Sequence, residues 1–448
     1  MTTLPDYRVD DIAIERLPRA QLESLQDERL RTMVAYAHER SGFYRDRFAA
    51  AGVASSDITG IADLPKLPFL TRAELDAEQL AHPPFGDYTC SPRESWMGLF
   101  TTSGTSGRKL KRVFSSRDWE LMLSRFRRHP FAEPSDIAMM LGPIDGLVGP
   151  SVAVEAWRRA GAIPVLAGLW DTRTKARAIA ELRPAIVAGA ASYLMHLAEV
   201  AAELGIDLSD CGIRSLNSFG EPGAAVDATR ATLEQHYHPP VMFDGYGLSE
   251  LWPLGGNCPH SQALHIPEDF AAVECVDPDS GEQVPDGEQG ELVYTNLIGD
   301  TQPLLRYRSR DIGRLRREPA CECGSTYARI ERIEGRTDDM VWYRGANFFP
   351  SAVEDIVRRQ PGLSPEYRIV LDQAEGGLPR LTIQVEGDAD DQRLRSALAG
   401  DLRGGLGVAP DIEVLAVGEL PRITQGKAKR LLDRREQATS TTTTGGQR

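Results

Sequence analysis

The chain has 448 residues, of which 41% are hydrophobic and 26% charged; these proportions are those of a globular protein and exclude a mainly disordered, collagen-like or coiled-coil chain. The net charge of −14 argues against nonspecific binding to nucleic acid or anionic membranes, because both require basic patches. The sequence contains no run of about 18 apolar residues, the length that a membrane-spanning helix needs. The opening MTTLPDYRVDD lacks the basic and apolar parts of a secretory signal. We therefore expect a cytoplasmic protein with no nucleic-acid or membrane partner.

Residues 1–95 are predicted to be mixed and mostly helical. From about 135 to 250, short apolar strands alternate with amphipathic helices. Strands are predicted at 163–166, 185–187, 213–219 and 241–243, and helices at 172–182, 192–204 and 224–236. Strands that alternate with helices of about 10–15 residues indicate βαβ units and a parallel sheet. This region is therefore predicted to be α/β.

Short alternating strands and Gly/Pro/Asp turns over 270–335 predict a β-rich subdomain. In the small α+β unit that follows, Ser351 and Glu354 have the spacing of a capping box, which would open a helix ending at Arg359. Strands are then predicted at 368–371, 381–385 and 412–416, with a helix at 392–402. We expect an N-terminal core over 1–335, a hinge at 336–340, a mobile C-terminal domain over 341–433 and a disordered tail over 434–448.

Five segments could carry chemistry. In Thr101-Thr-Ser-Gly-Thr-Ser-Gly-Arg-Lys109, hydroxyls, backbone N–H groups and bases could surround phosphate oxygens, although the spacing is not that of a Walker A loop. Asp244-Gly-Tyr-Gly-Leu-Ser-Glu250 follows a predicted strand, where ligands of open α/β sheets bind. There Tyr246 could stack on a base and Glu250 could hold Mg²⁺. The alternative for the first segment is a flexible linker. The alternative for the second is a glycine-rich turn with a packed tyrosine.

The third segment is Arg306-Tyr-Arg-Ser-Arg-Asp-Ile-Gly313, followed by Ile333-Glu-Gly-Arg-Thr-Asp-Asp339. The fourth, Arg344-Gly-Ala-Asn-Phe-Phe-Pro350, begins the small domain. The fifth, Pro421-Arg-Ile-Thr-Gln-Gly-Lys-Ala-Lys-Arg430, carries four bases and no acid. Considered one at a time, charged turns of this kind are most often solvated surface.

In this order, the five segments resemble the motifs of the adenylate-forming superfamily of acyl-CoA synthetases and related ligases, over about residues 95–433. That superfamily has a Ser/Thr/Gly loop, an aromatic-Gly-x-Ser/Thr-Glu element, an acid after a Tyr-Arg turn, a Gly-Arg-x-Asp hinge and a Gly-Lys near the end. Each motif is weak alone, but five in order are specific. The Arg306-Tyr-Arg turn, the Gly335-Arg-Thr-Asp-Asp-Met-Val run and Cys321-Glu-Cys-Gly most resemble the phenylacetate-CoA ligase branch.

The resemblance implies that a carboxylic acid attacks ATP, that pyrophosphate leaves, and that the acyl-adenylate passes to a thiol or another nucleophile. Because two anions must meet, such a site neutralises charge. By resemblance, Lys427 bridges the attacking carboxylate and the α-phosphate, Glu250 holds Mg²⁺ and Arg336 reaches the ribose or a phosphate. Asp311 accepts the ribose hydroxyls. Asp338 is the hinge position about which the small domain swings to bring Gly345 towards the thiol.

The resemblance implies the following nucleotide-site and hinge residues: Thr102, Ser103, Gly104, Thr105, Ser106, Gly107, Lys109, Gly220, Glu221, Pro222, Asp244, Tyr246, Gly247, Ser249, Asp311, Arg336, Asp338 and Gly345. Two positions depart from the family pattern. Ser309-Arg310 stands where Thr-Gly usually precedes the ribose acid, which adds a guanidinium beside the nucleotide. Ser249 replaces the more frequent threonine and keeps the hydroxyl.

Six cysteines are too few for a disulfide scaffold. Cys258, His260, His265, Cys321 and Cys323 nevertheless offer five ligands, and a closed structural zinc site takes four. We predict a Zn²⁺ site of Cys258, His265, Cys321 and Cys323, with His260 as a substitute, if the fold joins the two segments; the phenylacetate-CoA ligase branch has a similar Cys/His pattern. The alternative is a set of free buried thiols.

By resemblance, the acid binds near 141–149 and 192–193, with 217–220 along one side. Small residues there leave room for a flat ring, and Asp145 could meet an amino or hydroxyl substituent. An aromatic acid is favoured by analogy, and the alternative is a glycine-rich loop without substrate contact. The residues expected to contact the acid are Asp145, Gly146, Ser192, Tyr193, Asn217 and Gly220.

The leading interpretation is an ATP-dependent aryl-acid:CoA ligase that uses Mg²⁺ and carries structural Zn²⁺. One alternative transfers the acyl group to the phosphopantetheine thiol of a carrier protein or to an amine. A more remote alternative is a zinc-stabilised nucleotide-binding protein without catalysis, which is disfavoured because Lys427, Glu250 and Asp311 are all present. A homodimer is expected, although no sequence feature signals it.

Overall fold

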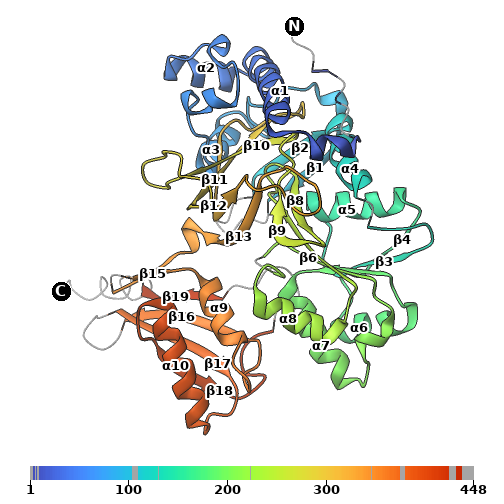
Figure 1. The fold of residues 1–448 in the computed structure, drawn as a ribbon, viewed down its shortest axis with the longest axis vertical. Coiled ribbons are helices and arrows are strands. Elements are labelled where there is room, and N and C mark those ends of the chain that lie inside the picture. Colours follow the sequence, from blue (N-terminus) through green and yellow to red (C-terminus); the bar gives the residue numbers. More distant parts are fainter. Residues whose placement is uncertain are drawn as a thin grey trace, which may run out of the picture.

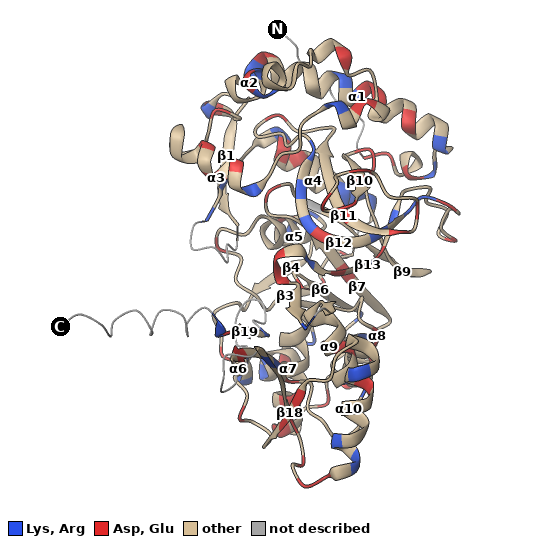
Figure 2. Ribbon diagram, turned by 90° about the vertical axis from the view of Figure 1, so that its left-hand side faces the viewer, with Lys and Arg blue, Asp and Glu red and all other residues tan. Residues whose placement is uncertain are grey.

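The computed structural model describes residues 4–5, 7, 10–102, 109–129, 131–221, 223–344, 346–373, 379–422 and 430–435. Figure 1 shows a larger part built around one long sheet and a smaller part, formed by the elements from β14 on, beside it. In the view of Figure 2, basic and acidic residues are interspersed over both parts. Within the described ranges, no helix is both long and apolar enough to cross a membrane.

The N-terminal region is helical, as predicted, and lies at one end of the large sheet (Figure 1). Its helices are α1 (Arg19–Arg40), α2 (Gly42–Ala51) and α3 (Arg72–Ala81). Helix α3 begins with a capping box: the Thr71 side chain accepts from the Glu74 backbone, and the Glu74 carboxylate accepts from the Thr71 backbone. This cap fixes where the helix starts and therefore where Arg72, its first residue, lies.

A mixed sheet forms the centre of the larger part, and eleven of the described strands belong to it, in the order β10-β11-β12-β13-β9-β8-β7-β6-β5-β3-β4. Strands β3 to β7 are parallel to their neighbours in this group, and the other pairings are antiparallel. The predicted βαβ region and the predicted β-rich region are both confirmed, but they share one continuous sheet. The strands are β3 (Ile137–Met140), β4 (Ile163–Leu166), β5 (Ile186–Gly189), β6 (Ser215–Phe219), β7 (Val241–Gly247), β8 (Pro253–Cys258), β9 (Ser261–His265), β10 (Ala271–Val276), β11 (Gln289–Asn296), β12 (Tyr307–Arg316) and β13 (Arg329–Arg336).

Helices cover both faces of the parallel half of the sheet. Successive side chains of each strand point to opposite faces, and both faces are apolar here. Val187 and Leu216 pack on the side of α6 (Thr172–Leu182), α7 (Ala191–Glu203) and α8 (Asp227–Tyr237). Ile186 and Ala188 pack on the side of α5 (Val148–Arg159). A separate hairpin, β1 (Trp96–Thr101) with β2 (Lys111–Ser115), precedes α4 (Ser116–Arg128) and brackets the Ser/Thr/Gly segment. The carboxyl ends of β5, β6 and β7 carry the predicted ligand-binding loops.

The smaller part is α+β, as predicted. Strands β18-β17-β16-β19 form one sheet, and β14 pairs with β15 in a second. The core under the larger of these sheets is filled from α9 and α10. The elements are β14 (Val341–Tyr343), β15 (Ala346–Phe348), α9 (Pro350–Arg358), β16 (Tyr367–Gln373), β17 (Pro379–Glu386), α10 (Gln392–Leu406), β18 (Asp411–Leu415) and β19 (Leu431–Asp433).

The predicted capping box of α9 is wrong. The helix begins at Pro350, whose fixed φ suits a first helical position, and its N-cap is Phe349, with no side-chain cap. Ser351 lies inside the helix and donates to the Glu334 backbone carbonyl. Glu354 instead pairs with Arg358 and accepts from the Thr229 hydroxyl of α8. Ser351 and Glu354 therefore contact the larger part instead of capping the helix.

Candidate active site

The Ser/Thr/Gly segment is closed at its base by Thr102. The buried Thr102 donates its backbone N–H to the Leu110 carbonyl (3.1 Å), and its Oγ1 accepts from the Leu110 N–H (3.2 Å). Lys109 is exposed. Several predicted residues lie outside the described part of the chain: Ser103, Gly104, Thr105, Ser106, Gly107, Pro222, Gly345 and Lys427.

Glu250, the predicted Mg²⁺ ligand, is paired with an arginine from the N-terminal region. Arg72 Nη1 lies 3.0 Å from Glu250 Oε1, and Arg72 Nε bonds Asp76 at 2.9 Å. Both side chains of the Arg72–Glu250 pair are largely buried. Sequence reasoning missed Arg72, because only folding joins two residues 178 positions apart. The one signal was the Thr-x-x-Glu capping box, which places Arg72 at the start of a helix.

The predicted ribose acid, Asp311, lies at the centre of a buried polar chain. The Tyr246 hydroxyl donates to Asp311 Oδ2 (2.6 Å), and the Tyr294 hydroxyl donates to that of Tyr246 (3.1 Å). Burial and the neighbouring Asp311 carboxylate raise the pKa of Tyr246 well above its usual value, so the phenol stays a donor. Strand register places Asp311 directly opposite Arg336, with Nη1 3.8 Å from Oδ1. The fold thus brings together three residues that sequence analysis assigned to the nucleotide.

Asp338, the predicted hinge residue, joins this group. Its Oδ1 accepts from Arg336 Nε (3.0 Å), and its Oδ2 lies 3.2 Å from Arg310 Nη1. Burial acts to raise the pKa of Asp338, but the hydrogen bond and charge of Arg336, with the charge of Arg310, hold it below its usual value. Arg310 has φ +67°, a conformation that glycine adopts most easily. The departure from Thr-Gly therefore provides a second cation for the Asp338 carboxylate.

Asp244 fixes the loop that begins with Gly220 and Glu221. Its Oδ1 accepts from Ser218 Oγ (2.6 Å), and its Oδ2 accepts from the Ala225 N–H (3.1 Å). Burial raises the pKa of Asp244 to about 6. Glu221 Oε1 accepts from the Ser192 backbone N–H (2.6 Å), so this loop is tied to the start of α7. Gly247 is exposed and Ser249 half-buried, just beyond Asp244 on the same strand and loop.

The residues predicted to contact the acid differ in burial. Ser192 has a buried hydroxyl without a hydrogen-bond partner among the described residues, and Asp145 is exposed. Gly146, at φ +70°, accepts from the Thr101 N–H (2.8 Å) and so ties its loop to β1. Gly220 is exposed at the end of β6.

The other two predicted acid contacts are held by protein groups. The Tyr193 hydroxyl bonds Thr172 Oγ1 (3.2 Å), and Lys175 Nζ lies 4.6 Å from the ring centroid, so that Tyr193 packs between α6 and α7. The buried Asn217 accepts from Ser215 Oγ (2.6 Å). Their contact with an acid stays a prediction.

The four favoured zinc ligands are gathered by the sheet. Cys258 and His265 end β8 and β9, while Cys321 and Cys323 lie in the connection from β12 to β13, which pairs with β9. Their ligand atoms lie within 4.8 Å of one another. The Cys258 and Cys321 sulfurs are 3.8 Å apart, and Cys323 Sγ is 3.6 Å from His265 Nε2. Tetrahedral zinc with Zn–S bonds of about 2.3 Å places two sulfurs about 3.8 Å apart, so the donor set fits Zn²⁺. The substitute His260 is exposed and lies outside this group.

Comparison with known protein families gives two matches that together span most of the chain. The AMP-binding enzyme model matches residues 23–296, and the AMP-binding enzyme C-terminal domain model matches residues 345–435. The phenylacetate-coenzyme A ligase of Thermus thermophilus is 32% identical, over 94% of this chain and 99% of that protein. The corresponding ligase of Aromatoleum evansii is 32% identical, over 94% and 96%.

Solved structures of a 2-hydroxyisobutyryl-CoA ligase match this chain in more than one state. In the postadenylation state with R3-HIB-AMP, the TM-score is 0.88 at 27% identity, covering 98% of this chain and 96% of that one. In the thioesterification state with 2-HIB-AMP and CoA, it is 0.70 at the same identity, covering 99% and 97%.

Proposed function

The chain belongs to the AMP-binding enzyme family, and from that premise we propose that it activates an aromatic carboxylic acid with ATP, releases pyrophosphate, and transfers the acyl group from the acyl-adenylate to the thiol of CoA. The observation that carries the proposal is the group of Asp311, Arg336 and Glu250 beside the loop ends of β6 and β7. The two guanidiniums beside these carboxylates, those of Arg72 and Arg336, provide the positive charge that a nucleotide and a second anion require.

Each described residue has a distinct part in this reaction. Asp311, oriented by the Tyr246 hydroxyl, accepts hydrogen bonds from the ribose. Arg336 lies opposite Asp311 on the neighbouring strand and neutralises phosphate charge. Glu250 is an oxygen ligand of the kind that Mg²⁺ takes together with substrate phosphates. Mg²⁺ would screen the triphosphate when bound, and Arg72 is the cation that holds Glu250 otherwise.

We propose that the small domain moves between the two half-reactions. The hinge would be 336–340, between a core over 1–335 and a mobile domain over 341–433. Support comes from the unequal match to two states of one related ligase, at TM-scores of 0.88 and 0.70. Lys427, in the segment between Arg422 and Arg430, would serve adenylation, and Gly345 would face the thiol donor after the swing.

The choice of an aromatic acid rests on the relatives. The Thermus and Aromatoleum proteins are named phenylacetate-coenzyme A ligases. The structural relative is instead named for a small branched hydroxy acid. Both types of acid therefore belong in the test.

The test is ATP–pyrophosphate exchange with phenylacetate, benzoate derivatives, 2-hydroxyisobutyrate and straight-chain acids, followed by CoA and mass detection of the thioester. We expect exchange only with aromatic acids, and thioester when CoA is added. Exchange without thioester would move the acceptor to a carrier-protein thiol or an amine. Exchange confined to small aliphatic acids would overturn the aromatic assignment but keep the ligase.

A further inference from the structure

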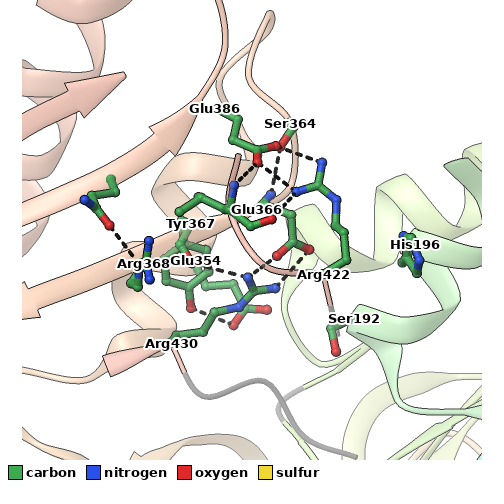
Figure 3. Close-up of polar contacts among 12 residues, drawn as sticks. Ser192, His196, Glu354, Ser364, Glu366, Tyr367, Arg368, Glu386, Arg422 and Arg430 are labelled. Atoms are coloured by element: carbon green, nitrogen blue, oxygen red, sulfur yellow. Dashed lines mark hydrogen bonds and ion pairs between the residues drawn. The ribbon is translucent and has the colours of Figure 1, made fainter. Parts of the chain in front are cut away.

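Two arginines bracket the segment that carries Lys427. Arg422 precedes residues 423–429 and Arg430 follows them. The seven residues between lie outside the described part of the chain, but both arginines are described, and each is held by a buried carboxylate (Figure 3).

Arg430 forms a buried pair with Glu366. Its two terminal nitrogens reach the two carboxylate oxygens, Nη2 to Oε1 at 3.2 Å and Nη1 to Oε2. Nη1 also donates to the Tyr367 carbonyl (3.2 Å), and the guanidinium lies 4.9 Å from the Tyr367 ring centroid. The Arg430 carbonyl accepts from the Ile369 N–H (2.8 Å), so side chain and backbone are both fixed at this end.

Arg422 forms a similar pair with Glu386, whose side chain is fully buried. Nη1 and Nη2 each lie 2.8 Å from a different carboxylate oxygen, a two-bond geometry that constrains orientation as well as distance. The Leu420 N–H donates to Glu386 Oε1 (2.7 Å), and Ser364 Oγ donates to Oε2 (2.8 Å).

Ser364 joins the two pairs, because its Oγ also accepts from the Glu366 backbone N–H (3.2 Å). One end of this network reaches the larger part: Arg422 Nε lies 3.7 Å from Glu199 Oε2 on α7. Glu199 shares a helix face with Ser192, seven residues earlier, and Ser192 is the buried hydroxyl that begins the predicted acid-contact segment of α7. Figure 3 shows this helix facing Arg422.

We propose that Glu366 and Glu386 are positioning residues for adenylation, which through Arg430 and Arg422 fix both ends of the seven-residue segment that carries Lys427. A segment with one loose end samples many more conformations than one fixed at both ends, and a displacement of about 1 Å at a reacting group can cost about a hundredfold in rate. The inference rests on the proposed function, because it assigns these pairs to the lysine of the first half-reaction.

The test measures the two half-reactions separately in Glu366→Gln, which keeps an uncharged acceptor against Arg430. We expect kcat for ATP–pyrophosphate exchange to fall about tenfold or more, with KM for the acid changed less than about threefold. Thioester formation from a supplied acyl-adenylate should stay within about threefold. Arg422→Gln, at a side chain that is 19% exposed, is the second variant and should give the same split. A misfolded variant would lose both half-reactions, in which case Arg422→Gln decides.

A double-mutant cycle with Lys427→Ala identifies the group through which the pairs act. If they act through the lysine, adding Glu366→Gln to Lys427→Ala should change the residual exchange rate less than about twofold. A further tenfold loss in the double variant would overturn the proposal, as would unchanged exchange in both single variants. Arg380→Ala is the control, because it removes an exposed ion pair with Asp411 in the same sheet and should leave both rates unchanged. Full exchange activity in Lys427→Ala alone would overturn the lysine assignment itself, a separate failure.

Discussion

Arg72 Nη1 lies 3.0 Å from Glu250 Oε1, which joins the first residue of an N-terminal helix to the predicted Mg²⁺ ligand across the domain. A guanidinium placed beside the expected triphosphate would meet phosphate oxygens once Mg²⁺ engages the carboxylate. With the proposed function, the pair would give the N-terminal helical region a place at the nucleotide.

Arg72→Ala should therefore weaken nucleotide binding. We expect KM for MgATP in the exchange reaction to rise about tenfold, with Arg72→Lys intermediate because it keeps the charge but not the fork. Calorimetry with a nonhydrolysable ATP analogue checks the same point without turnover. Arg45→Ala, which removes exposed contacts to backbone carbonyls in the same region, is the matched control. Equal affinity for the analogue in Arg72→Ala and wild type would leave the guanidinium with no part in binding ATP.

Lys427→Ala should separate the two half-reactions. The loss of the cation proposed to bridge carboxylate and α-phosphate is expected to lower ATP–pyrophosphate exchange by about a hundredfold or more. Thioester formation from supplied acyl-adenylate and CoA should be spared, because that step no longer joins two anions. The measurement is one assay of each half-reaction on the same preparation. Equal loss of both would contradict the assignment.

The Cys/His group should hold about one zinc per chain. His265→Ala is expected to lower the bound zinc, measured by elemental analysis, and to lower the melting temperature, because the metal stabilises the folded state. His260→Ala is the matched control, since His260 is exposed and outside the group. Wild-type protein purified without chelators that contains under about 0.3 zinc per chain would contradict the metal assignment.

Arg310→Gly should change the balance between half-reactions rather than either chemistry. The substitution removes a strained φ of +67° and one of the two cations on Asp338. Because exposed ion pairs contribute about 0–1 kcal/mol, we expect the ratio of thioester formation to exchange to change by no more than about fivefold. Arg310→Ala is the matched control, because it keeps the strained φ at this position and loses the ion pair with Asp338. A changed ratio in Arg310→Gly with none in Arg310→Ala would assign the effect to backbone strain.

Asp244 should make stability depend on pH. Burial raises its pKa from 3.8 to about 6, so between these values the folded state keeps a proton that the unfolded state has released. Its contribution to the free energy of unfolding therefore falls as the pH rises through this window. Relative to Asp244→Asn, wild type should lose about 2 kcal/mol between pH 4 and pH 7, measured by urea unfolding. A difference between wild type and Asp244→Asn that stays flat from pH 4 to pH 7 would refute the shift.

The sequence by itself determined the local structure and the family. The periodicity of the apolar residues predicted the strand at 163–166 and the helix at 172–182, because each segment must bury one face whatever its partners are. The order of five motifs predicted the family, and the Cys/His set predicted the four residues that the fold gathers. In these cases the signal lies in residue type and spacing.

Only the tertiary structure decided which distant groups meet. The pairing of Asp311 with Arg336 and of Glu366 with Arg430 depends on strand order and register, and that of Arg72 with Glu250 depends on where α3 packs. No local pattern encodes either. The capping box at Ser351 failed for the same reason, since Glu354 had a stronger partner in Arg358 and a contact across to α8. A charged side chain can satisfy its hydrogen bonds in several ways, and the neighbours that folding brings to it determine which one it takes.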